Sequence, residues 1–107
     1  MEQVIVITGA GGGLGSVFAR ELARDGKSIA VLDYDIRAAG QVAAQIRADG
    51  GKAAAIRGNV VDKASMEQAR QEVREKLGRC NVLINCAGIQ DQVGGQAVLG
   101  RQIRQST

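Results

Sequence analysis

The stretch that decides the fold of this chain is Val4-Ile5-Val6-Ile7-Thr8-Gly9-Ala10-Gly11-Gly12-Gly13-Leu14-Gly15. Four β-branched residues in a row are typical of a strand buried on both faces of a parallel sheet. The glycines that follow let the backbone turn tightly and approach a ligand closely. A helix that starts after such a turn offers free N–H groups and the positive end of its dipole. This arrangement is typical of a site that holds the pyrophosphate of a dinucleotide.

The apolar spacing along the chain predicts four strands that alternate with three helices. Leu14, Val17, Phe18 and Leu22 share one helix face, and Gly26 marks the end of that helix. Further helices are predicted over 36–46 and 66–77, and further strands over 29–32, 53–56 and 82–84. Such alternation indicates an α/β fold with a parallel sheet and right-handed crossovers. We expect a truncated Rossmann-like, doubly wound sheet in the order 3-2-1-4, with the first two helices on one face and the third on the other.

Composition bounds the remaining possibilities. The 107 residues suffice for one core, and the net charge of +3 is spread along the chain, which argues against a nucleic-acid partner. We expect neither a signal peptide nor a membrane span, because no apolar run is long enough for one. It has no histidine and only two cysteines, Cys80 and Cys86, so we expect no metal site and no disulfide, but two small buried thiols. Reduced thiols favour a cytoplasmic location.

The character of the chain changes after residue 89. Residues 1–89 are predicted to form one dinucleotide-binding half-domain. Residues 90–107 carry glycines, glutamines and few large apolar side chains, and are predicted to be a divergent tail that forms a loop or one short helix.

Two motifs together resemble those of the short-chain dehydrogenase/reductase family. Thr8 followed by Gly9, Gly13 and Gly15 matches T-G-x-x-x-G-x-G of the classical branch, and Gly12 also allows the T-G-x-x-G-x-x-G spacing of the extended branch. The later Asn85-Cys86-Ala87-Gly88 is similar to the classical N-N-A-G motif and favours that branch. The resemblance implies that the pyrophosphate is held by the turn, whose candidate residues are Gly9, Gly11, Gly12, Gly13, Leu14 and Gly15.

An acidic residue ends the second predicted strand, roughly 20 residues after the glycines. This residue, Asp33, can accept hydrogen bonds from ribose hydroxyls and would repel a 2′-phosphate, as would Asp35. Gly12 stands where phosphate-binding members of the family often carry a basic residue. We therefore expect NAD as the cofactor and consider NADP less favoured, although Arg37 could accommodate a phosphate.

The resemblance also assigns the rest of the cofactor site. Tyr34 lies at the ribose end, and Asn59-Val60 takes the place of an Asp-Val pair that contacts adenine in the family. Asn85 corresponds to the residue that ties the fourth strand to its neighbours. Ala87 and Gly88 would lie under the nicotinamide ribose.

The residues that perform the chemistry in the family are missing from this sequence. Family members use a Ser, a Y-x-x-x-K pair and an Asn, whereas here Tyr34 is the only tyrosine and no lysine follows Lys76. Our first hypothesis is therefore the NAD-binding N-terminal part of such an oxidoreductase, inactive alone. The second is a non-catalytic nucleotide-binding or interaction module. The third is a methyltransferase-type domain, which G-x-G-x-G at Gly9 would allow but Thr8 and the N-x-A-G motif disfavour.

In the complete family fold the fourth strand is central, with a further strand along its far edge. In this chain the strand at 82–84 would leave that edge unpaired. Exposed apolar edges favour pairing with another chain. We therefore expect self-association through the edge of the fourth strand.

Overall fold

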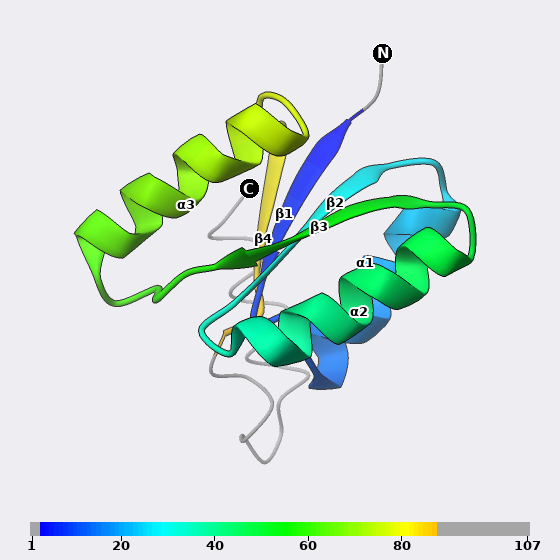
Figure 1. The fold of residues 1–107 in the computed structure, drawn as a ribbon, viewed down its shortest axis with the longest axis horizontal. Coiled ribbons are helices and arrows are strands. Elements are labelled where there is room, and N and C mark those ends of the chain that lie inside the picture. The colour runs from blue at the N-terminus through cyan, green and yellow to red at the C-terminus, as the bar shows by residue number, and fades with distance from the viewer. Residues whose placement is uncertain (1–2, 88–107) are drawn as a thin grey trace.

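The computed structural model describes residues 3–87, which form a parallel sheet covered by helices on both faces (Figure 1). Strands and helices alternate strictly along the chain, as the apolar spacing predicts. The elements are β1 (Val4–Thr8), α1 (Gly13–Arg24), β2 (Ser28–Asp33), α2 (Ile36–Ala48), β3 (Lys52–Arg57), α3 (Lys63–Lys76) and β4 (Val82–Asn85). The predicted tail over 90–107 lies outside the described residues.

The four strands are parallel and lie in the order β3-β2-β1-β4, which confirms the predicted topology. In the register Ile7 of β1 is opposite Val31 of β2 on one side and Ile84 of β4 on the other. From β1 the chain adds β2 and β3 on one side, and α3 then crosses the sheet so that β4 is added on the other side of β1. The strand order therefore reverses between β1 and β4. This reversal is the switch point at which open α/β sheets bind ligands.

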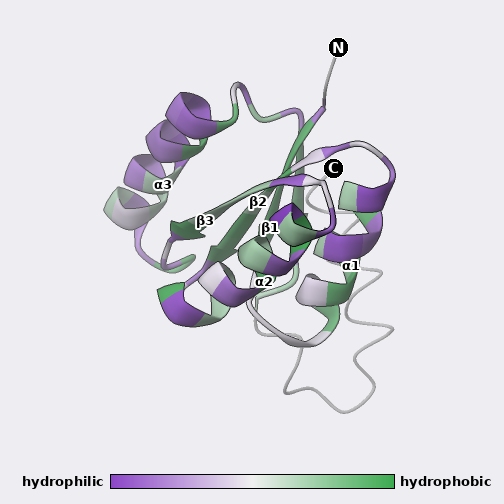
Figure 2. Ribbon diagram, turned by 45° about the vertical axis from the view of Figure 1, so that its right-hand side comes forward, coloured by the Kyte–Doolittle hydropathy of each residue, from purple (hydrophilic) through white to green (hydrophobic). Residues whose placement is uncertain are grey.

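The helices divide as expected between the two faces of the sheet, with α1 and α2 on one face and α3 on the other (Figure 1). Since side chains alternate along a strand, Ile7 and Val31 pack in the core under α1 and α2, whereas Leu32 and Ile56 pack under α3. The strands are apolar and the outer helix faces are polar (Figure 2). The smaller core under α3 leaves a groove of about 550 Å³ beside β4, lined in part by Met66, Val73, Cys80 and Leu83.

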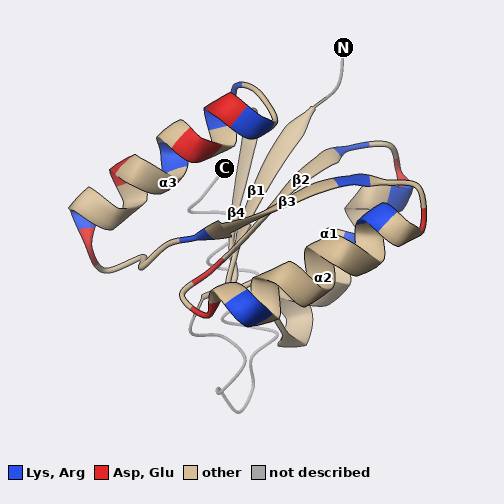
Figure 3. Cartoon of the chain, viewed as in Figure 1, with Lys and Arg blue, Asp and Glu red and all other residues tan. Residues whose placement is uncertain are grey.

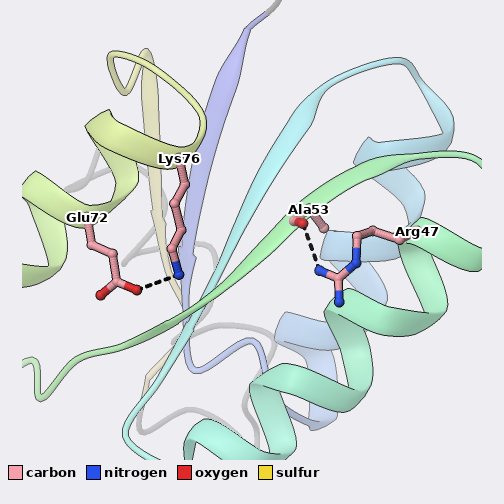
Figure 4. Close-up of polar contacts among 4 residues, drawn as sticks. All are labelled: Arg47, Ala53, Glu72 and Lys76. Carbon is pink, nitrogen blue, oxygen red and sulfur yellow. Dashed lines mark hydrogen bonds and ion pairs between the residues drawn. The ribbon is translucent and has the colours of Figure 1, made fainter.

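Capping residues fix where the second and third helices begin. The side chain of Asp35 accepts hydrogen bonds from two amides of the first turn of α2, and Asp62 does the same for α3. At the other end of α2, the Arg47 guanidinium donates to the Ala53 carbonyl oxygen at 2.9 Å, which ties the helix to β3 (Figure 4). Lys76 and Glu72 pair at 2.8 Å across one turn of α3 (Figure 4).

Basic and acidic residues alternate in sequence along α3 (Figure 3). Within residues 3–87 no helix is long and apolar enough to cross a membrane. The same residues contain no cluster of side chains suited to a metal ion.

The two cysteines differ from each other more than the sequence suggested. Both are free thiols, as expected. Cys86 is buried, and this burial raises the pKa of its thiol. The expectation that Cys80 is also buried is wrong, because it precedes β4 at the open rim of the groove and is exposed.

Candidate functional site

The glycine turn joins β1 to α1 at the carboxyl end of the sheet. Gly9 and Gly13 have positive φ angles of 65° and 55°, which side-chain-bearing residues rarely adopt. A Cβ on Gly9 would come within 2.8 Å of the Ala87 Cα, and one on Gly15 would collide with the Gly9 carbonyl oxygen. The turn is therefore packed against the chain that leaves β4. Gly12, the N-cap of α1, has open space around its Cα.

Asp33 lies directly beside this turn. Its Oδ2 accepts a hydrogen bond from the Gly11 amide at 2.9 Å, and its Oδ1 accepts one from the Asp35 amide at 3.0 Å. Gly11 is needed for this approach, because a Cβ there would lie 2.9 Å from Oδ2 and 2.8 Å from the Ala38 Cβ. Asp33 and the glycine turn, which the sequence predicts to bind parts of the same cofactor, thus lie next to each other. Two amides hold the Asp33 carboxylate beside the start of α1.

A side-chain network closes the β1–β4 side of the site. The Thr8 hydroxyl donates to Asn85 Oδ1 at 2.6 Å and accepts from the amides of Cys86 and Ala87 at 3.1 and 3.3 Å. Thr8 therefore extends the β1–β4 ladder beyond its last backbone pair. Asn85 ties β4 to β1 as the resemblance implies, and Ala87 is brought beside the glycine turn. Gly88 lies outside the described residues.

Asn59 and Val60 follow β3 and lie one strand further along the same edge. The Gly58 amide donates to the Asp33 carbonyl oxygen at 3.2 Å, so this loop starts beside the end of β2. Asn59 Oδ1 accepts from the Val61 amide at 3.2 Å, and its own amide donates to the Ser65 hydroxyl at 2.9 Å. One lone pair of the Asn59 carbonyl is thus already used within the loop, while the Val60 side chain is 41% exposed.

The sequence did not predict two contacts, one at the amino end of the β1–β4 pair and one beside the site. Asn81 Oδ1 accepts from the Val4 amide at 2.7 Å, so asparagines hold both ends of β4 against β1. The Arg57 guanidinium carbon lies 5.4 Å from the centre of the Tyr34 ring. The strand pattern offered a partial signal for the second contact, since Asp33 and Arg57 directly follow the predicted strands over 29–32 and 53–56, which are adjacent in the predicted order.

Comparison with known proteins agrees with this geometry. The sequence model of a family described as short chain dehydrogenase matches residues 3–106. The chain belongs to the short-chain dehydrogenase/reductase family. This match extends past residue 89, where the motifs end.

Individual relatives support the assignment. An uncharacterized oxidoreductase of Haemophilus influenzae is 42% identical over 87 residues, which are 81% of this chain and 30% of that protein. A structure with bound NAD, of a provisionally named D-mannonate oxidoreductase from the same species, is 39% identical with a TM-score of 0.74 over 78% of this chain and 30% of that one. A family member from Burkholderia phymatum in complex with NAD is 30% identical with a TM-score of 0.73, over 77% and 29% of the two chains. The chain thus spans about a third of the length of the relatives it matches.

Proposed function

We propose that this chain is the NAD-binding N-terminal part of a short-chain dehydrogenase/reductase that transfers hydride. The observation that carries the proposal is the 2.9 Å hydrogen bond between the Gly11 amide and Asp33. It joins the turn suited to a pyrophosphate with the carboxylate suited to a ribose. The NAD-bound structures of two relatives add independent support.

The residues present fit the cofactor. At Gly9, Gly11 and Gly15 a Cβ would clash with neighbouring atoms. The absence of side chains at these positions allows other parts of the chain to pack closely against the backbone of the turn. The start of α1 at Gly13 offers unpaired amides to the two phosphates. Tyr34 and Val60 are exposed at the adenosine end, and Ala87 lies at the β4 end.

Asp33 carries the preference for NAD over NADP. A carboxylate has about four lone-pair positions, and the two amides use one on each oxygen, so acceptor capacity remains for ribose hydroxyls. A 2′-phosphate in the same place would meet a fixed negative charge. Because the amides hold the carboxylate, it cannot swing away to relieve the repulsion.

The nicotinamide ring, when bound, supplies the hydride acceptor or donor, and the described residues bind and orient the cofactor. Tyr34 is the only tyrosine, and it follows β2, which β1 separates from β4. It therefore lies at the wrong end of the site to exchange a proton beside the nicotinamide. We accordingly expect the 107-residue chain by itself to bind the cofactor without turnover. A cytoplasmic location also stays a proposal, supported by the two free thiols.

Calorimetric titration with NADH and NADPH tests the proposal. NADH should bind more tightly, and Asp33→Ala should narrow the difference by raising the affinity for NADPH relative to NADH. Asp49→Ala is the matched control, since Asp49 caps the far end of α2. Equal affinities for the two cofactors in the unmodified chain would refute the assignment.

The alternative of a non-catalytic module makes the same binding prediction and differs in activity after complementation. When a purified C-terminal part of a relative, which carries the Y-x-x-x-K pair, is mixed with this chain and the relative's carbonyl substrate, NADH should reduce that substrate if the enzyme assignment is right. The Thr8–Asn85 network favours the enzyme, because it places Ala87 beside the turn. Binding of NADH with no activity in any such mixture would favour the module.

A further inference from the structure

Tyr34 is a largely exposed aromatic residue beside Asp33. It follows Asp33 at the end of β2 and is 64% exposed. Within residues 3–87 its one ring contact is with Arg57, whose guanidinium carbon lies 5.4 Å from the ring centre. This distance is within the range of about 6 Å at which a cation is attracted to an aromatic face. One face of the ring is thus covered by a cation, and most of the side chain remains accessible.

The position of Arg57 is unexpected for its charge. Arg57 and Asp33 are register partners across the parallel strands β3 and β2, so two opposite charges lie on adjacent strands. Both oxygens of Asp33 instead accept backbone amides, from Gly11 and Asp35. In the described part of the chain no carboxylate pairs with Arg57, and its guanidinium lies over Tyr34. Asp33 therefore remains free of Arg57 and can accept hydrogen bonds from the ribose, whereas Arg57 contacts the Tyr34 ring.

The surroundings of Tyr34 suit a planar base. The loop after β3 brings Val60, 41% exposed, to the same edge of the sheet. The Gly58 amide bonds to the Asp33 carbonyl oxygen and holds the start of this loop beside β2. Bases stack on aromatic side chains irrespective of their sequence identity, because every base has a π face. A ring covered on one face by a guanidinium has its other face available for such a base.

We infer that Arg57 is a positioning residue for the adenine base of the dinucleotide, which stacks on the face of Tyr34 that Arg57 leaves open. The inference rests on the proposed function, since the base is that of the bound cofactor. Arg57 acts through Tyr34: it holds the ring beside Asp33, so that base and ribose are received together. Guanidinium, phenol ring and adenine then form three successive layers.

Tyrosine emission provides a direct test. Tyr34 is the only tyrosine and the chain has no tryptophan, so emission of the full chain reports this side chain alone. NAD and ADP-ribose should change its emission with saturation, whereas nicotinamide mononucleotide should not. Free N-acetyltyrosinamide, titrated in parallel, corrects for light absorbed by adenine. Calorimetry on the same samples measures binding independently of the fluorophore.

Variants separate positioning from mere stability. Arg57→Gln should weaken NAD binding about two- to fivefold, the range expected for an exposed cation–π contact, and should reduce the emission change. Arg57→Lys keeps the charge and should recover part of both effects. Tyr34→Phe keeps the ring, so it should lose less affinity for NAD than Tyr34→Ser, which should lose about fivefold or more. Arg24→Gln, an exposed arginine at the far end of α1, is the control and should change neither readout.

Two outcomes overturn the inference alone: NAD binding by calorimetry without a change in Tyr34 emission, or an Arg57→Gln chain that binds NAD as tightly as the unmodified one. Absence of NAD binding in both measurements would overturn the proposed function as well. Circular dichroism melts of each variant show whether it is folded at the assay temperature. The emission test on the unmodified chain decides the question even if a variant unfolds.

Discussion

The two edges of the sheet, β3 and β4, are built differently. β3 has six residues, begins with Lys52 and ends with Arg57, and α2 is tied to it through the Arg47–Ala53 hydrogen bond. β4 has four residues without a charge, and none of them is fully buried. Leu83 at its middle is 39% exposed beside the groove under α3.

Charged residues on an edge strand protect it from pairing with another chain, and short strands do so by offering few hydrogen bonds. β3 uses the first device, whereas β4 has only the second. In the described part of the chain β4 pairs with β1 alone, so its other edge has no strand partner. We therefore propose that any self-association of this chain occurs through β4 and not through β3.

The largest effect is expected from matched substitutions in the two edge strands. Ile56→Ala in β3 removes a side chain with no exposed surface and should lower the free energy of unfolding by about 2–5 kcal/mol. Ile84→Ala in β4 removes a half-buried one and should cost clearly less. Urea denaturation of both variants measures the difference. Equal costs would show that β4 is packed as firmly as β3.

A bound cofactor should stabilise the part of the sheet that contains β3. The proposed adenosine contacts come from the ends of β2 and β3, and a ligand at 100 times its dissociation constant adds about 2.7 kcal/mol to stability. NADH should therefore raise the melting temperature, and Asp33→Ala should reduce that rise. A melting temperature that does not respond to NADH would contradict the placement of the site.

Self-association should respond to a charge on β4. Leu83→Lys should raise the dissociation constant of any dimer by about tenfold, equivalent to about 1.4 kcal/mol, because a lysine on an edge strand opposes pairing. Val61→Lys is the control, since Val61 is 87% exposed and lies after β3. Sedimentation equilibrium distinguishes the two variants. A stronger effect of Val61→Lys would place the contact at the other edge.

The smallest effect concerns the thiols on either side of β4. Burial raises the pKa of Cys86, so at a given pH its thiol holds less thiolate than an ordinary cysteine, whereas Cys80 is exposed to reagents. Iodoacetamide should label Cys80 first at neutral pH, and Cys86 only as pH rises. Because the unfolded chain loses the Cys86 proton at lower pH than the folded one, stability should fall slightly as pH passes the ordinary thiol pKa. Mass spectrometry of labelled peptides measures the order.

The fold was predictable because its signals are local. Runs such as Val4–Ile7 and the stripe at Leu14, Val17 and Phe18 each report a strand or a helix, and right-handed crossovers then leave few topologies. The proximity of Asp33 to the glycine turn follows from the same topology, since β1 and β2 end at one edge. The order of the strands therefore predicts at which edge of the sheet the candidate site lies.

Contacts that the sequence does not predict are those in which a side chain has several possible partners in the folded chain. Asp33 had Arg57 as a charged neighbour and backbone amides as alternatives, and only the folded turn shows that the amides of Gly11 and Asp35 are preferred. The sequence predicts burial of Cys80 because an apolar strand follows it. How deeply β4 and its flanking residues are buried depends on the elements that pack against them, which the residues of β4 do not specify. Asn81 was overlooked because an asparagine before a strand carries no distinctive spacing.

The pairing of β4 with β1 has a consequence for the order of folding. The Thr8–Asn85 contact joins residues 77 positions apart, whereas β1 and β2 meet across a single helix. Closing a long loop costs entropy before the contact is formed, so non-local pairing is slow. We expect β4 to join the sheet last and to leave it first. Hydrogen exchange should then show the amides of β4 opening well before those of β2, while the rest of the sheet stays intact.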